Sequence, residues 1–340
     1  MIIAATVLAI LIVVYVIVID AVAPSILKSK IISALKDSCS DCELQIESVE
    51  TNAIQPWEIT LKKINLKAGQ PGRSSADVKI EILKVDVKIL AALSKQLIIE
   101  SLEGDVVDVT YAEGEALKKA AAPNDEGGDP LLFAIENTRV SNLEFRYAHS
   151  QHGVTSFLRV HKISAWISGL GNTPELKDQL TNGEFRGVIE KSGQAQLKIA
   201  ALTRPGLHYV DVNLFIDKQK LDDLNSFFTG NDGIVFHGLL LHANATVNVR
   251  DQKSKAHVEG TYKEVDFKQT ATATTSAVEA VLTNLGADLL MNKTNTDRLP
   301  RDREADLEVQ RKKGEALVHF ILRSMKECAL EVAKKKDSRK

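Results

Sequence analysis

The chain has 340 residues, of which 44% are hydrophobic, and its formal net charge is −2 at pH 7. This composition supports a folded body and excludes the strongly basic surface that favours binding to nucleic acid. Aromatic residues make up only 5% of the chain, which argues against base-stacking surfaces. The three cysteines are too few for a disulfide-stabilised scaffold. We therefore expect no nucleic-acid partner.

The first segment of the chain is strongly apolar. Residues 1–19 carry no charge, and Thr6 is their only polar residue. At about 1.5 Å per residue they span roughly 28 Å as a helix, close to the ~30 Å hydrocarbon core of a bilayer. No second run of this kind follows Asp20. The sequence therefore predicts a single transmembrane anchor over residues 1–23.

A cleaved signal peptide is the alternative interpretation of this segment. Ala21-Val22-Ala23 has the small-residue pattern of a cleavage site. However, no basic residue precedes the apolar run, and Pro24 would follow the cut. We therefore favour an uncleaved anchor. Lys28, Lys30 and Lys36 follow it, and the positive-inside rule would place the body in the cytoplasm.

Apolar and polar residues alternate from residue 42 to about residue 270, which is typical of strands with one apolar face. The clearest run lies at 77–90, where the apolar residues change parity. This change predicts a β-bulge near Leu83, or a strand that bends there. The pattern predicts about ten to twelve strands. Because helices do not intervene regularly, we expect an antiparallel sheet.

Helical patterns occur at 25–36, 218–228, 275–290 and 303–336. Residues 120–130 have the sequence AAAPNDEGGDP, which predicts a loop and a break between two halves. The predicted organisation is an anchor (1–23), an N-terminal helix with the first part of the sheet (24–122), the second part of the sheet (131–270) and a C-terminal helical segment (271–336).

Motifs that carry chemistry are few. Cys39 and Cys42 form a C-x-x-C, but it ends a predicted helix and leads into a strand, unlike a redox motif. A local disulfide, or two unreactive thiols, is the better interpretation. The eight histidines are scattered, without the spacing of a metal-binding helix. No nucleophile elbow, P-loop or dinucleotide glycine pattern is present. The sequence predicts no enzyme, no catalytic residue, no metal ion and no cofactor.

The order of features along the chain resembles a known family. It comprises an N-terminal anchor, a helix over 25–36, the strand Leu44–Val49, Trp57–Leu61, the long strand Val78–Ile89, Leu97–Leu102 and a turn at Tyr111–Gly114. This order resembles the N-terminal part of AsmA-like bacterial envelope proteins, which are distantly similar to bridge-like lipid transfer proteins. The later half is similar in its short helix at Leu221–Phe228 and in the strand that begins at Ile234.

The resemblance implies a mainly β fold with a strongly curved antiparallel sheet that forms an apolar groove. It also implies a single-pass protein of the bacterial inner membrane with its body in the periplasm, in conflict with the orientation that Lys28 and Lys30 predict. The groove would bind phospholipid acyl chains and contribute to lipid transport or envelope maintenance. The residues expected on its apolar face are Ile59, Leu61, Val78, Ile80, Val85, Val87 and Ile89. Ordinary core packing explains each of them equally well.

A non-enzymatic envelope scaffold is the rival hypothesis. Its sheet would pack against its own C-terminal helices at 275–336, and its surface would recruit a protein partner. Helices that fill the groove would leave no place for lipid, so the position of this segment separates the two hypotheses.

Overall fold

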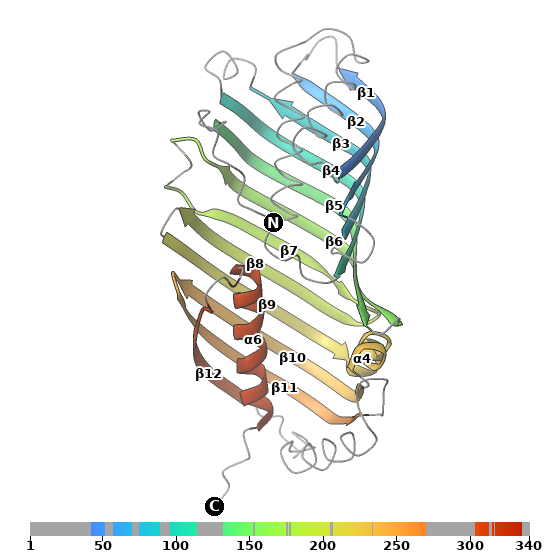
Figure 1. The fold of residues 1–340 in the computed structure, drawn as a ribbon, viewed down its shortest axis with the longest axis vertical. Helices are drawn as coiled ribbons and strands as arrows, with labels where there is room; N and C mark the ends of the chain where they lie inside the picture. The colour runs from blue at the N-terminus through green and yellow to red at the C-terminus, as the bar shows by residue number, and fades with distance from the viewer. Residues whose placement is uncertain are drawn as a thin grey trace, which may run out of the picture. The chain divides into compact units, whose positions relative to one another are not determined.

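The computed structural model describes residues 42–51, 57–69, 75–88, 96–113, 132–151, 154–174, 176, 178–204, 207–232, 234–269, 303–312, 315 and 317–334. Strands dominate this part of the chain (Figure 1). They are β1 (Cys42–Thr51), β2 (Glu58–Ala68), β3 (Ser75–Val87), β4 (Gln96–Glu113), β5 (Leu132–Gln151), β6 (Val154–Gly171), β7 (Thr181–Ile189), β8 (Gly193–Arg204), β9 (Leu207–Lys220), β10 (Ile234–Arg250), β11 (Lys253–Gln269) and β12 (Arg303–Gln310).

These twelve strands form one sheet whose spatial order is the order of the chain, from β1 to β12. Neighbouring strands are antiparallel wherever their register is described. Sequential neighbours of this kind need only short connections, as in the two-residue turn between Arg250 and Lys253. The prediction of a mainly β, antiparallel fold is therefore confirmed for the described residues.

Contacts divide the chain into two compact units. Unit 1 comprises Met1–Ala148 and Lys162–Thr181, and unit 2 comprises His149–His161 and Asn182–Lys340. The chain passes between the units at three points, within β5, within β6 and at the start of β7. The predicted break at 120–130 lies outside the described residues.

The strands β1–β4 of unit 1 align their apolar residues in rows across the sheet. One row joins Ile46, Ile64, Ile80 and Val107, which are cross-strand partners in turn. The next rows are Leu44–Leu66–Val78–Val109 and Val49–Leu61–Leu83–Gly104. Since partners directly opposite each other share a face, one face of these strands is apolar throughout.

The apolar residues change parity at the same level of each strand, and we call this line the face switch. In β3 the buried residues pass from Ile80 to Leu83, while Glu81 and Ile82 are both exposed. The register with β2 and β4 continues unbroken through this point. The strand therefore changes face without a register shift there, and the shift between β3 and β4 lies further on, at Asp86/Val87.

Unusual backbone angles mark the face switch in the neighbouring strands. Lys63 in β2 and Val106 in β4 have positive φ, at 50° and 51°. The register places both residues opposite Glu81 of β3. The left-handed conformation turns two successive side chains to the outer face, and it is especially unfavourable for a β-branched residue such as Val106.

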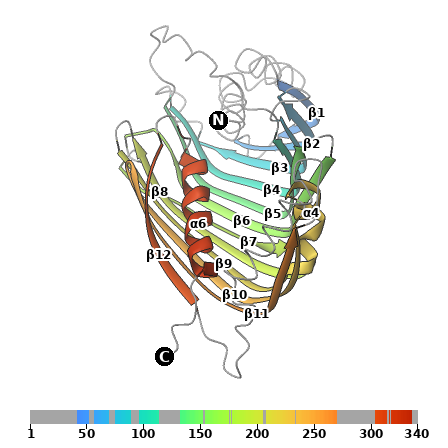
Figure 2. The ribbon, with the colours of Figure 1, turned by 60° about the horizontal axis from the view of Figure 1, so that its bottom comes forward.

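The helices of the described residues belong to unit 2. A 3-10 helix, η1 (Leu221–Leu224), continues into α4 (Asn225–Asp232), which confirms a helix close to the predicted 218–228. The last helix, α6 (Leu317–Lys334), contacts β10, β11 and β12 and lies across one face of them (Figures 1 and 2).

The prediction of one helix over 303–336 is wrong for its first part, because Arg303–Gln310 is strand β12. Its alternate residues Arg303, Ala305 and Val309 are buried, and the strand pairs with β11. The glutamate, alanine and leucine residues of this segment favour helix locally, but pairing with β11 buries Ala305 and Val309. Tertiary contact decides the conformation here.

Several predicted segments lie outside the described residues. They are the anchor at 1–23, the helix at 25–36 and the helix at 275–290. Among the helices that are described, none is long and apolar enough to cross a membrane.

The strain at Val106 leads to a stability prediction. We expect Val106→Asn to raise the free energy of unfolding by about 1 kcal/mol, because asparagine tolerates positive φ and the strain is of order 1–3 kcal/mol. Little burial is lost, since Val106 is 45% exposed. Urea unfolding followed by circular dichroism measures the change.

Val107→Asn is the matched control, because Val107 is the next residue and is only 6% exposed. It should destabilise the protein by about 1–3 kcal/mol through an unpaired buried amide. An equal decrease in the free energy of unfolding in both variants would show that Val106 carries no backbone strain.

Candidate functional site

The apolar face of β1–β4 is the part of the molecule where the predicted groove residues meet. Ile59, Leu61, Val85 and Val87 are 2%, 2%, 0% and 3% exposed. Ile59 lies directly opposite Val85, and Leu61 directly opposite Leu83. The period-two alternation thus identified residues that share one face.

The remaining predicted residues lie on the same face but nearer its margin. Ile80 is 9% exposed and pairs with Ile64, while Val78 is half-buried and pairs with Leu66. Ile89 lies outside the described residues. The cluster also contains residues that the prediction missed, including Ile99, which is 0% exposed, and Ile135.

The margin of this cluster is only partly buried. Leu44, Val78 and Val109 are the partly buried members of one row, in which Leu66 is buried. The other partly buried residues that pack against the cluster are Phe133, Val140, Leu143 and Leu170. Every described element of unit 1 is a strand. Half-buried apolar residues beside a fully buried cluster are the places in unit 1 where an apolar ligand would gain further contacts.

The opposite face of these strands is charged in a complementary way. Lys67 lies opposite Asp77 between β2 and β3, and Lys79 lies opposite Asp108 between β3 and β4. At the face switch, Lys63 Nζ lies 2.8 Å from Glu47 Oε2 of β1. Because this face carries pairs of opposite charges on neighbouring strands, it is the face that is exposed to water.

The corresponding apolar face of unit 2 is covered by α6. Phe320, Ser324, Cys328 and Val332 recur every four residues and are 0%, 0%, 0% and 7% exposed. Beneath them lie small or branched side chains of the strands, among them Ala256, Val258, Ala305, Val247 and Val249. The small residues allow the helix to approach the sheet closely.

Short polar contacts hold α6 against the strands. The Ser324 hydroxyl donates to the Phe320 carbonyl at 2.8 Å, so the Ser254 hydroxyl donates to Ser324 Oγ at 2.8 Å. The thiol of Cys328 donates to the Ala305 carbonyl at 3.1 Å. Cys328 is a free, buried cysteine, and these contacts make it part of the packing.

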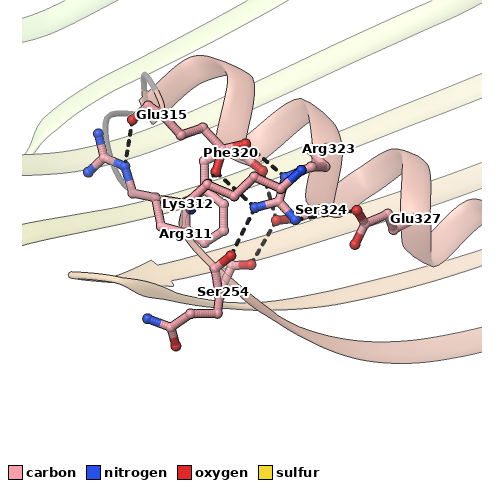
Figure 3. A network of polar contacts seen from close by, with 9 residues as sticks. Ser254, Arg311, Lys312, Glu315, Phe320, Arg323, Ser324 and Glu327 are labelled. Carbon is pink, nitrogen blue, oxygen red and sulfur yellow. Dashed lines mark hydrogen bonds and ion pairs between the residues drawn. The ribbon is translucent and has the colours of Figure 1, made fainter.

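An ion pair connects the start of α6 to the end of β12 (Figure 3). Arg323 donates to both carboxylate oxygens of Glu315 at 2.8 Å and to the Gln310 carbonyl at 2.9 Å. The backbone N–H of Lys312 donates to Glu315 as well. Hydrogen bonding from Arg323, then from Lys312, lowers the pKa of Glu315 to about 2.

The remaining polar clusters hold elements together. His237 Nδ1 lies 2.7 Å from Asp222 Oδ1, which connects η1 to β10 and lowers the pKa of Asp222. Asp211 accepts from Asn248 and Arg250 of the next strand. In the described part of the chain, neither cluster combines a nucleophile, a base and a buried pocket, the set that acyl-transfer chemistry would need.

The predicted Cys39–Cys42 pair is only half within the described residues. Cys42 at the start of β1 is disulfide-bonded, and Cys39 lies outside the described residues. The pairing therefore stays a prediction.

One cluster of possible metal ligands was missed by the sequence analysis. His257, Glu259 and Glu304 have ligand atoms that all lie within 4.8 Å of one another. His257 and Glu259 are two residues apart, so in a strand their side chains lie on the same face. This spacing could have identified them as a pair. Glu304 was hidden because its segment was predicted to be helical.

No protein-family model matches the chain, and no curated protein matches it. The comparisons therefore leave the resemblance to AsmA-like proteins as an expectation from the sequence.

The packing of α6 leads to a second prediction. Phe320→Ala should lower the free energy of unfolding by about 3–5 kcal/mol, because it removes a fully buried ring and leaves a cavity. Leu322→Ala is the matched control on the exposed side of the same helix, since Leu322 is 57% exposed. Its effect should stay within about 0.5 kcal/mol. Urea unfolding measures both variants. A similar decrease in the free energy of unfolding in both would mean that α6 does not pack through the face that contains Phe320.

The Glu315–Arg323 pair leads to a pH prediction. The pKa of Glu315 falls from 4.5 to about 2 on folding, so its stabilising effect is complete above pH 4.5 and disappears as the pH falls through about 2. We expect Glu315→Gln to be less stable than the parent near neutral pH, with the difference vanishing toward pH 2. Urea midpoints over this range measure it.

Glu308→Gln is the control for this pair, because the Lys255–Glu308 ion pair is 77% and 72% exposed. An exposed pair of this kind contributes little, so its variant should track the parent at every pH. A difference between Glu315→Gln and parent that is constant with pH would refute the linkage.

Proposed function

We propose that this chain is a membrane-anchored, non-enzymatic protein of the bacterial envelope that binds phospholipid acyl chains. The anchor is the predicted helix at 1–23, and the body faces the periplasm. The lipid lies in a groove formed by the apolar face of unit 1, on a strongly curved sheet. This function contributes to lipid transport or envelope maintenance.

One observation carries the proposal, namely the uninterrupted apolar face of β1–β4. The three central rows contain only aliphatic side chains and Gly104, and the rows beside them add Cys42, Tyr111 and Thr51 at the two ends of this face. Three of the four members of one row, Leu44, Val78 and Val109, are only partly buried. An acyl chain laid along that row would contact all three.

The energetics suit exchange of lipid with a membrane. Burying apolar surface is worth roughly 25 cal/mol per Å², or about 0.8 kcal/mol per methylene. A lipid in a bilayer already buries its methylenes, so moving it onto an apolar protein face changes the free energy little. Such a face can therefore accept and release lipid without covalent chemistry.

The scaffold remains the second candidate, and α6 favours it. In unit 2 the chain covers its own apolar face with Phe320, Cys328 and Val332. A protein with both faces satisfied in this way would act through its polar surface, by recruiting an envelope protein.

A matched pair of substitutions on β4 tests the lipid proposal. The full chain is purified in a mild detergent, and bound phospholipid is measured by native mass spectrometry and lipid extraction. Val109→Asp places a charge on the apolar face and should reduce bound phospholipid at least about tenfold, since burying a charge opposes acyl contact. Val106→Asp places the same charge on the exposed outer face and should leave the lipid content unchanged.

A third variant covers the case in which Val109→Asp fails to fold. Val78→Trp adds apolar volume to the same row and should displace lipid without introducing charge. Circular dichroism and unfolding midpoints establish that each variant is folded. Absence of phospholipid from the parent protein, or its equal retention in all three variants, would reject the groove and favour the scaffold.

A further inference from the structure

Three potential metal ligands converge on the outer face of β11 and β12. They are His257, Glu259 and Glu304, whose ligand atoms lie within 4.8 Å of one another. His257 and Glu259 are two residues apart on β11, and Glu304 is the cross-strand partner of Glu259 on β12. Alternation places all three on the face opposite the buried Ala256, Val258 and Ala305. They therefore lie on the opposite side of the sheet from α6.

The imidazole of His257 is oriented for metal binding. Its Nδ1 lies 2.9 Å from Asp306 Oδ1, and Asp306 is its cross-strand partner. When Nδ1 carries the proton and donates to Asp306, the lone pair of Nε2 is available as a ligand. Nε2 lies 4.0 Å from Glu259 Oε2. At zinc sites a carboxylate usually accepts a hydrogen bond from the other ring nitrogen of a ligating histidine, which fixes the orientation of the ring.

The cluster brings several carboxylates together around one imidazole. Glu259 and Glu304 are like charges directly opposite each other on paired strands, which is destabilising by itself. Asp306 adds a third carboxylate. The neighbouring Lys255 forms an ion pair with Glu308, in which its Nζ lies 3.4 Å from Glu308 Oε1.

An adjacent side chain holds one of the carboxylates in place. Asn244 on β10 donates to Glu259 Oε1 at 3.1 Å, which orients that carboxylate.

We propose that His257, Glu259 and Glu304 bind one divalent transition-metal ion, with Zn²⁺ as the best match. An imidazole with carboxylates suits zinc better than the all-oxygen sites of magnesium or calcium. Bonds of about 2.0–2.2 Å place zinc ligands about 3.3 Å apart, so the exposed side chain of Glu304 moves inward on binding. The ion ties β12 to β11. This inference goes beyond the proposed function and does not depend on lipid binding.

Zinc titration of the untagged full-length chain, after treatment with a chelator, tests the proposal. We expect one equivalent of zinc to bind with a Kd below about 10 μM and to raise the unfolding midpoint, because zinc binds the folded state. His257→Gln and Glu304→Gln should each abolish this equivalent. Asp306→Asn should weaken zinc binding by about 10- to 100-fold, because the carboxylate that orients the His257 ring is lost.

Glu308→Gln is the matched control, because Glu308 lies on the same strand and face but outside the cluster. It should bind zinc like the parent. Circular dichroism without zinc shows that each variant is folded, so loss of binding is not loss of structure. The proposal is overturned if the parent binds no zinc in this range. It is also overturned if the His257 and Glu304 variants bind as tightly as the parent.

Discussion

An antiparallel sheet with one apolar face imposes the main constraint on this protein, because that face must be kept from water. Alternation along each strand separates apolar from polar side chains, and in-register pairing then gathers the apolar ones into rows. In unit 1 these rows run from β1 to β4 through Ile46, Ile64, Ile80 and Val107. The charged side chains of β1–β4 lie on the opposite face.

Unit 2 meets the constraint with its own chain. The four-residue spacing of Phe320, Ser324, Cys328 and Val332 provides a stripe that fits over small strand residues such as Ala256 and Ala305. The contact of Ser324 with Ser254 and the ion pair of Glu315 with Arg323 fix the position of α6 along the strands. In unit 1 the strands themselves provide the described part of the cluster, and its half-buried margin is where a lipid chain would lie under our proposal. The lipid hypothesis therefore rests on unit 1, and the scaffold hypothesis rests on unit 2.

On the outer face, the register places oppositely charged side chains next to each other. These charges keep this face of the sheet toward water. Lys67 with Asp77 and Lys79 with Asp108 are such pairs. Against this pattern, Glu259 opposite Glu304 is an exception, and His257 lies beside it. A second like-charge pair on the outer face is Glu58 opposite Asp86. The face switch is a second departure, in which Val106 accepts an unfavourable backbone conformation so that neighbouring strands change parity together.

The sequence by itself determined the fold class and which residues share a face, because both depend on local alternation. That Ile59 and Val85 lie on the apolar face and that a helix lies near 218–228 were predictable in this way, as was the change of parity near Leu83. Only the tertiary structure decided that Arg303–Gln310 is a strand, since local propensity favours helix and pairing with β11 outweighs it. Only the structure placed α6 over unit 2, and only pairing across strands brought Glu304 to His257 and Glu259. Such contacts join residues far apart in the chain, and the pattern within one strand carries no information about its distant partners.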